Sequence, residues 1–277
     1  MKKKVFNTVL MTLVSVIAAL SVLMAVPTKA EAATKKKSTK TVSAEEQQVI
    51  DLTAYLNALK KQGGSEADIE YAEAALALAT KALEEKQAAD AQAAAQAAAQ
   101  QAIIDQLAKT ATQPAVVYPI IYVGDSRMVQ MHETMGNTGV VYIAENSKGY
   151  TWFRDEAIPY IDSYAGKGSK IVINLGVNDP GNADNYVALV NAKALEWRAK
   201  GATVYYATVN PVSDNPYTSP EQVDMINDKL KAGLQGVNII DTYSYLKSTG
   251  YTLVDGLHYD SATYINLYNY ILNSIVK

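Results

Sequence analysis

The sequence predicts an α/β protein whose second half is a three-layer α/β/α domain with a five-stranded parallel sheet, preceded by an α-helical hairpin. Five short apolar, β-branched runs alternate with helical stretches after residue 118. Runs that are apolar along their whole length are typical of strands buried on both faces, as in a parallel sheet covered by helices. In the first half, apolar residues recur at steps of three and four, which is the period of a helix.

Composition limits the chemistry of the chain. It has no cysteine, which excludes thiolate zinc sites, iron–sulfur clusters and a cysteine nucleophile. It has 2 histidines, so a three-histidine metal site is also excluded. We therefore expect no metal and no cofactor. The net charge of −3 gives no reason to expect nucleic-acid binding, which needs a concentrated basic surface.

Residues 1–32 are predicted to be a signal peptide. Three lysines at residues 2–4 precede an apolar run from Val9 to Val26, and small residues follow up to Ala30 and Ala32. This pattern is typical of a secretory signal that is cleaved after one of these two alanines. The alternative is an uncleaved anchor, because the run is near the length that spans a bilayer. We expect a secreted or cell-wall-associated protein with no stable membrane span after cleavage. An exported chain without cysteine suits a Gram-positive bacterium.

Residues 33–42 form a basic tail that contains four lysines among serine and threonine. A solvated, disordered tail is the simpler interpretation, and contact with an anionic cell-wall polymer is the alternative.

Residues 43–109 are predicted to form a helical hairpin that acts as a spacer. Apolar residues at helical spacing lie on both sides of Gly63 and Gly64. They are Val49, Leu52, Leu56 and Leu59 before the glycines, and Ile69, Ala72, Leu76, Ala79 and Leu83 after them. The tract from Ala88 to Ala102 is strongly helix-forming but offers little apolar area, so it cannot build its own core. Coiled-coil-like self-association through the hairpin remains an alternative. Residues 110–117 contain a proline and form the linker to the domain at residues 118–277.

The strands and helices of this domain follow from its hydrophobic pattern. The predicted strands are Ile120 to Val123, Val140 to Ala144, Lys170 to Leu175, Thr203 to Val209 and Val237 to Ile240. The predicted helices are Arg127 to Met135, Phe153 to Ala165, Tyr186 to Lys200, Pro220 to Leu234 and Ser261 to Val276.

The polar residues that follow the strands are the candidate functional residues, because reactive groups gather beyond the carboxyl ends of parallel strands. These segments are Gly124-Asp125-Ser126-Arg127, Asn146-Ser147-Lys148-Gly149, Gly176-Val177-Asn178-Asp179 and Asp255-Gly256-Leu257-His258. Together they hold the groups that acyl transfer requires. Ser126 is the candidate nucleophile, His258 the base that activates it, and Asp255 the carboxylate that orients the histidine. The backbone N–H groups of Ser126 and Gly149 and the side-chain amide of Asn178 could bind the oxyanion.

Each of these residues also has a simpler structural interpretation. Ser126 could cap a helix. Asn178 and Asp179 could stabilise a turn. His258 could stand at the start of a helix without chemistry, and His132, inside a helical stretch, is expected to be structural or solvent-facing.

Three aromatic residues follow Gly149. Tyr150, Trp152 and Phe153 could line the approach to Ser126 and stack against a sugar ring, or the last two could pack beneath the following helix.

Residues 118–277 resemble the SGNH hydrolases, also called the GDSL esterase/lipase superfamily. The motifs that carry the resemblance are Gly124-Asp125-Ser126, Gly176-Val177-Asn178-Asp179 and Asp255-Gly256-Leu257-His258, whereas the segment containing Gly149 matches more loosely. The resemblance implies a flavodoxin-like fold, a Ser126-His258-Asp255 triad and an oxyanion hole of Ser126, Gly149 and Asn178. Arg127 replaces the leucine common after the serine, a departure expected to alter the pocket without touching the chemistry.

The expected function is that of a secreted serine esterase acting on O-acetyl or other acyl esters of cell-wall or other carbohydrate. Its partner would then be an acylated carbohydrate or another ester. The alternatives are a lysophospholipase or thioesterase of the same superfamily and a non-catalytic wall-binding scaffold protein.

Overall fold

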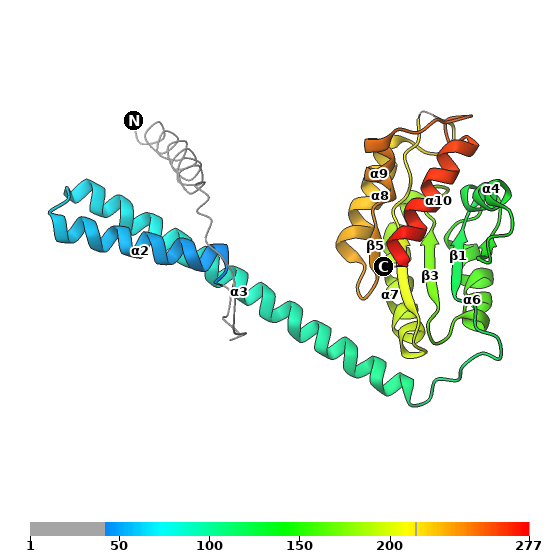
Figure 1. The fold of residues 1–277 in the computed structure, drawn as a ribbon, viewed down its shortest axis with the longest axis horizontal. Helices are drawn as coiled ribbons and strands as arrows, with labels where there is room; N and C mark the ends of the chain where they lie inside the picture. Colours follow the sequence, from blue (N-terminus) through cyan, green and yellow to red (C-terminus); the bar gives the residue numbers. More distant parts are fainter. Residues whose placement is uncertain (1–41, 214, 277) are drawn as a thin grey trace, which may run out of the picture. The chain divides into compact units, whose positions relative to one another are not determined.

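The computed structural model describes residues 42–213 and 215–276 (Figure 1). The predicted signal peptide and all of the basic tail except Val42 lie outside the described residues. The chain divides into two units between Leu83 and Glu84. Within the described ranges, no helix has both the length and the apolar character needed to cross a membrane.

The first unit is built from helix α2 (Ala44–Gln62) and the beginning of helix α3 (Glu66–Ala108). A capping box starts α2, because the Ser43 hydroxyl accepts the Glu46 N–H at 3.1 Å and the Glu46 carboxylate accepts the Ser43 N–H at 2.9 Å. The helix ends at Gly63, whose φ of 70° lies in the left-handed region that glycine adopts readily. The predicted pair of helices separated by this glycine turn is confirmed.

The second unit contains a five-stranded sheet in the order β2-β1-β3-β4-β5, and all its strand pairs are parallel. The strands are β1 (Ile120–Gly124), β2 (Val141–Ala144), β3 (Lys170–Asn174), β4 (Thr203–Ala207) and β5 (Asn238–Ile240). Gly124 pairs with Ala144 on one side and with Asn174 on the other, so the carboxyl ends of three strands meet at one edge. This flavodoxin-like order and the predicted fold class are confirmed.

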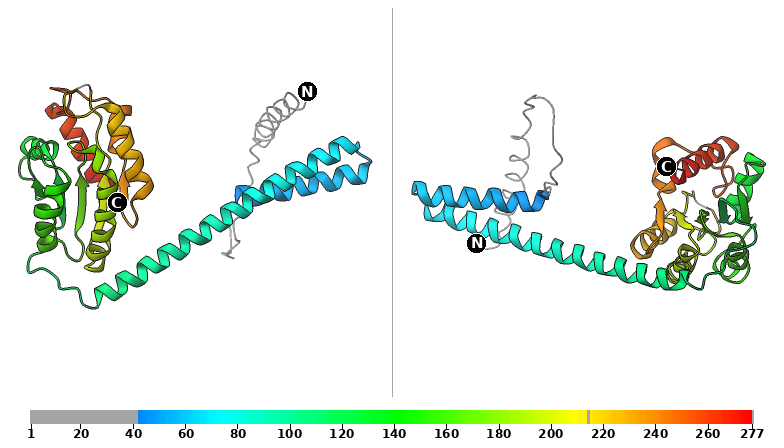
Figure 2. Two further views of the ribbon diagram at one scale, coloured as in Figure 1. Left: turned by 180° about the vertical axis from the view of Figure 1, so that it is seen from behind. Right: turned by 60° about the horizontal axis from the view of Figure 1, so that its bottom comes forward.

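Helices cover both faces of the sheet, as the two further views show (Figure 2). Alternate side chains of β1 belong to different cores: Ile121 and Val123 pack on one face, and Tyr122 packs on the other. The first core is closed by α6 (Ile158–Tyr164), α7 (Ala183–Ala199) and α8 (Pro220–Gly233). The second is closed by α4 (Ser126–Met135), α9 (Thr242–Thr249) and α10 (Ser261–Ile275).

The helices differ from the predictions in three places. α9 was not predicted, because its sequence has Leu246 as its single aliphatic residue and is otherwise polar or tyrosine. Its capping by Asp241 and the burial of Leu246 stabilise it instead. The predicted helix from Phe153 to Ala165 begins earlier, with α5 (Tyr150–Trp152), and a π-helical turn (Phe153–Ala157) joins α5 to α6. A short 3-10 turn (Pro180–Asn182) leads directly into α7, which begins before the predicted Tyr186.

The end of α3 and the linker, which belong to the second unit, are bonded to turns of its α/β domain. Gln100 donates a hydrogen bond to Gln235 at 2.9 Å. The Gln113 amide bridges two turns, since it donates to the Lys200 carbonyl at 2.8 Å and accepts the Lys167 N–H at 3.0 Å. Lys167 and Lys200 precede β3 and β4, so these contacts lie at the amino ends of the strands.

Candidate active site

Ser126 lies at the carboxyl edge of the sheet, at the first position of α4. Asp125, not Ser126, caps this helix, because its carboxylate accepts the Arg127 N–H at 3.0 Å. The interpretation of Ser126 as the capping residue is therefore wrong. A side chain at Gly124 would meet Met128 Cγ at 2.2 Å, so only glycine allows this tight passage from strand to helix.

Ser126, His258 and Asp255 form a hydrogen-bonded chain. Ser126 Oγ lies 2.9 Å from His258 Nε2, although the two residues are 132 positions apart. His258 Nδ1 lies 2.7 Å from Asp255 Oδ2. The structure thus brings together the three residues in the geometry that nucleophile activation requires.

The loop before α10 carries both His258, which contacts Ser126, and Asp255, which contacts His258. Asp255 Oδ1 accepts the backbone N–H groups of Leu257 and His258, at 3.0 and 2.7 Å. Burial opposes ionisation of this carboxyl group, but its hydrogen bonds with the His258 ring and with the two backbone N–H groups lower the pKa of Asp255 to about 2. The carboxylate is therefore charged at neutral pH and able to hold the imidazole N–H.

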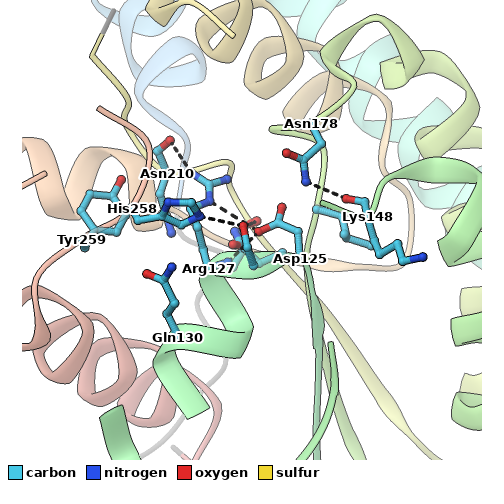
Figure 3. A network of polar contacts seen from close by, with 12 residues as sticks. Asp125, Arg127, Gln130, Lys148, Asn178, Asn210, His258 and Tyr259 are labelled. Atoms are coloured by element: carbon cyan, nitrogen blue, oxygen red, sulfur yellow. Dashed lines mark hydrogen bonds and ion pairs between the residues drawn. The ribbon is translucent and has the colours of Figure 1, made fainter. Parts of the chain in front are cut away.

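The loops after β2 and β3 bring Gly149 and Asn178 into one place. Asn178 Nδ2 donates to the Lys148 carbonyl at 2.8 Å (Figure 3), and Asp179 Oδ2 accepts the Tyr150 N–H at 2.7 Å. A side chain at Gly149 would approach Asp179 Oδ2 to 2.5 Å, so the loops meet this closely only because residue 149 is glycine. An amide nitrogen carries two N–H donors, so Asn178 can hold Lys148 and still offer a donor to an oxyanion.

Asp179 has a role that the sequence did not reveal. Besides Tyr150, it accepts hydrogen bonds from the Tyr186 hydroxyl at 2.9 Å and from Asn182 Nδ2 at 3.0 Å. Burial raises the pKa of Tyr186, so this hydroxyl keeps its proton and remains a donor. Asp179 therefore anchors the Gly149 loop to α7, beyond the local turn role expected for it. The sequence feature that could have indicated this role is the position of Asp179 directly after Asn178.

Asp125 and Arg127, the residues on either side of Ser126 in the chain, form a buried charge pair. Asp125 is completely buried and the Arg127 side chain is 1% exposed, with Arg127 Nε 3.7 Å from Asp125 Oδ1. Burial raises the pKa of Asp125, and the positive charge of Arg127 opposes that increase. We expected the Arg127 side chain to alter the pocket. The structure instead buries this side chain in the protein interior.

The aromatic residues after Gly149 divide between the core and the surface. Phe153 is completely buried and Trp152 is 8% exposed, so both pack in the first core and neither is placed to stack on a sugar. Tyr150 is half-buried and packs edge-on against Tyr186, with ring centroids 5.5 Å apart. His132 stacks on Tyr142 with the rings 4.3 Å apart, which is a structural role, as expected.

No cluster of three or more histidine, aspartate or glutamate side chains suited to a metal ion occurs in the part of the chain that the structure describes.

No protein-family model matches the chain, and neither does any curated protein sequence. Among solved structures, the chain is similar to a GDSL-like lipase from Bacteroides thetaiotaomicron, with 20% identity, a TM-score of 0.44, and 61% of this chain and 93% of the other covered. A member of the lipolytic protein G-D-S-L family from Veillonella parvula has 15% identity, a TM-score of 0.45, and coverage of 57% and 98%. The C-terminal catalytic domain of a Streptococcus pneumoniae peptidoglycan O-acetyltransferase has 15% identity, a TM-score of 0.43, and coverage of 58% and 94%.

Proposed function

We propose that residues 118–277 form a serine esterase of the SGNH type that hydrolyses acyl esters through an acyl-enzyme. The observation that carries this proposal is the continuous chain from Ser126 Oγ through the His258 ring to the Asp255 carboxylate. Ordinary packing does not require a histidine to join a serine and a carboxylate at the carboxyl edge of a parallel sheet, whereas nucleophilic catalysis does.

The reaction follows from this geometry. His258 Nε2 takes the proton of Ser126 as Oγ attacks the ester carbonyl carbon, and the charge on the carbonyl oxygen is bound by Asn178 and by the N–H groups of Gly149 and Ser126. His258 then gives the proton to the leaving alcohol oxygen, the ester bond breaks, and the acyl group remains on Ser126. A water molecule repeats the sequence, giving the free acid and the original serine. Asp255 stabilises the imidazolium formed in each half.

For the substrate, we propose an O-acetyl or other short acyl ester of a carbohydrate outside the cell. The predicted signal peptide supports export, and Tyr150, which adjoins Gly149, has an apolar face and a polar hydroxyl suited to a sugar. A long acyl chain would instead need an apolar channel, in which each buried methylene contributes about 0.8 kcal/mol.

The decisive experiment labels the wild-type protein with a fluorophosphonate and locates the adduct by mass spectrometry. We expect the adduct on Ser126, and we expect Ser126→Ala to fold normally and to lose both labelling and ester hydrolysis. Labelling of Ser147 instead, or hydrolysis by Ser126→Ala, would contradict the proposal.

Acyl specificity is tested with p-nitrophenyl acetate, butyrate and octanoate. A carbohydrate O-acetyl esterase should show kcat/KM falling steeply from acetate to octanoate. Values that rise along this series would favour the lysophospholipase or thioesterase alternative, and no hydrolysis of any ester would favour a non-catalytic scaffold.

A further inference from the structure

The residue directly after the proposed nucleophile, Arg127, is a buried arginine. The hydrogen bonds described for it are not among those of the Ser126-His258-Asp255 triad. The Arg127 guanidinium has Asp125 on one side, as described above, and on the other its Nη1 donates to the Asn210 carbonyl at 3.1 Å (Figure 3). Asn210 belongs to the segment that follows β4 and is itself buried. The guanidinium therefore joins the start of α4 to a segment 83 residues away.

That segment is also bonded to the loop that carries His258. The Tyr259 hydroxyl donates to the Pro211 carbonyl, and Tyr259 is the residue after the proposed base. The Ser213 N–H donates to the Gly256 carbonyl at 2.9 Å, two residues before His258. Residues 210–213 thus lie between the element of the nucleophile and the loop of the base, with hydrogen bonds to each.

We infer that Arg127 is a positioning residue that acts through residues 210–213. It holds Ser126 and His258 in register, which here means at the relative position that proton transfer between them requires. The inference rests on the proposed function, because register matters only if these two residues exchange a proton. Ser126 and His258 belong to elements distant in sequence, so their 2.9 Å separation depends on how α4 and the His258 loop are held relative to each other. Misplacement of reacting groups by about 1 Å can lower turnover about a hundredfold.

Arginine suits this position because its planar fork presents donors in different directions at once. One edge faces the Asp125 carboxylate and another donates to the Asn210 carbonyl. A leucine would fill the space without bonding either group, and the single ammonium of a lysine cannot reproduce both contacts.

The test must separate register from folding, because removing Arg127 alone leaves the buried Asp125 without its counter-charge. We therefore choose the double variant Asp125→Asn/Arg127→Met, which removes both charges and keeps an amide able to cap α4. Arg127→Lys is the second variant, since it keeps the charge beside Asp125. Met131→Ala is the matched control: Met131 lies on the same helix and is buried, but its thioether has no N–H or O–H to donate to the Asp125 carboxylate or the Asn210 carbonyl.

The measurements are the thermal midpoint, kcat and KM for p-nitrophenyl acetate, and the second-order rate of fluorophosphonate labelling, which reports serine activation without an acyl substrate. In the double variant we expect kcat and the labelling rate to fall about 10- to 100-fold while KM stays within about threefold of wild type. Arg127→Lys should fold, because it keeps the charge beside Asp125, and should be slowed in the same two rates. Met131→Ala should melt earlier and keep both rates.

Wild-type kcat and labelling in a folded double variant would overturn the inference, as would an equal loss of rate in Met131→Ala, since general loosening would then explain the result. If the double variant does not fold, wild-type rates in Arg127→Lys overturn it. A wild-type protein that is not labelled on Ser126 contradicts the proposed function, and this inference with it.

Discussion

At the scale of single residues, Asp255 is the clearest case of local hydrogen bonds setting an ionisation state. Its pKa in the folded protein is about 2, against an ordinary value of 3.8. Because the folded state binds the proton more weakly than the unfolded state, Asp255 adds to the free energy of unfolding above about pH 4. That contribution is lost as the pH falls from about 4 towards 2.

We therefore predict that the difference in unfolding free energy between wild type and Asp255→Asn shrinks as the pH falls through this range. Urea unfolding at several pH values measures it. Tryptophan fluorescence reports the right unit, because both tryptophans, Trp152 and Trp197, lie in the second unit. A difference that does not change between about pH 5 and pH 2 would contradict the assignment.

Asn178 is predicted to act on turnover rather than on binding. An oxyanion donor is typically worth about a hundred- to a thousandfold in kcat, because it bonds the charged oxygen most strongly in the transition state. We expect Asn178→Ala to lose activity on this scale with little change in KM. Asn185→Ala is the matched control, since this exposed asparagine bonds only to Asn182 among the contacts described. Turnover of Asn178→Ala equal to that of the control would exclude the oxyanion role.

At the scale of elements, the contact between the loops after β2 and β3 depends on Gly149. An alanine there would bring its Cβ against the Asp179 carboxylate, so the loop must move or Asp179 must release the Tyr150 N–H. We predict that Gly149→Ala loses at least about tenfold in kcat and that overpacking costs about 1–3 kcal/mol of stability.

Gly181→Ala provides the control for this prediction, because a Cβ at Gly181 meets no atom within 4 Å. It lies in the adjacent 3-10 turn and should keep wild-type kcat and stability. Steady-state kinetics and thermal unfolding of the two variants test this prediction. Equal behaviour of both would mean that the loops tolerate displacement.

Elements also differ in how well their own sequences predict them. The five strands lie where the β-branched runs predict, with ends shifted by no more than two residues. Strands buried on both faces need apolar residues at nearly every position, and that requirement is visible locally. α9 could not be found in this way, because it depends on the burial of Leu246 against the second core.

At the scale of the whole molecule, the contacts of α3 and the linker bear on which fragment folds best. Within the second unit, Ile104 is 6% exposed, and Gln100 and Gln113 bond to turns at the amino ends of the strands. The proposed catalytic residues lie at the opposite, carboxyl edge of the sheet. Stability and activity should therefore respond differently to removal of residues 84–114.

We predict that a fragment of residues 84–277 keeps both the stability of the second unit and its turnover. A fragment of residues 115–277 should keep its turnover on p-nitrophenyl acetate but melt several degrees lower, since burial of one isoleucine alone stabilises by about 1.5–3 kcal/mol. Thermal unfolding and steady-state kinetics of the two fragments test this. A folded 115–277 fragment without activity would show that the stalk contributes to the site.

The sequence by itself determined the order of the strands and of the helices other than α9, and the positions of Ser126, Asn178 and His258 at strand ends and helix starts. Those features depend on side-chain periodicity and on glycines beside polar residues, which neighbours along the chain reveal. Only the tertiary structure decided that Trp152 and Phe153 are core residues, that Asp179 anchors the Gly149 loop, and that Arg127 lies between Asp125 and Asn210. The contact between Tyr150 and Asp179 spans 29 residues of the chain, and the contact between Arg127 and Asn210 spans 83. A local pattern carries no information about which distant group a side chain will meet.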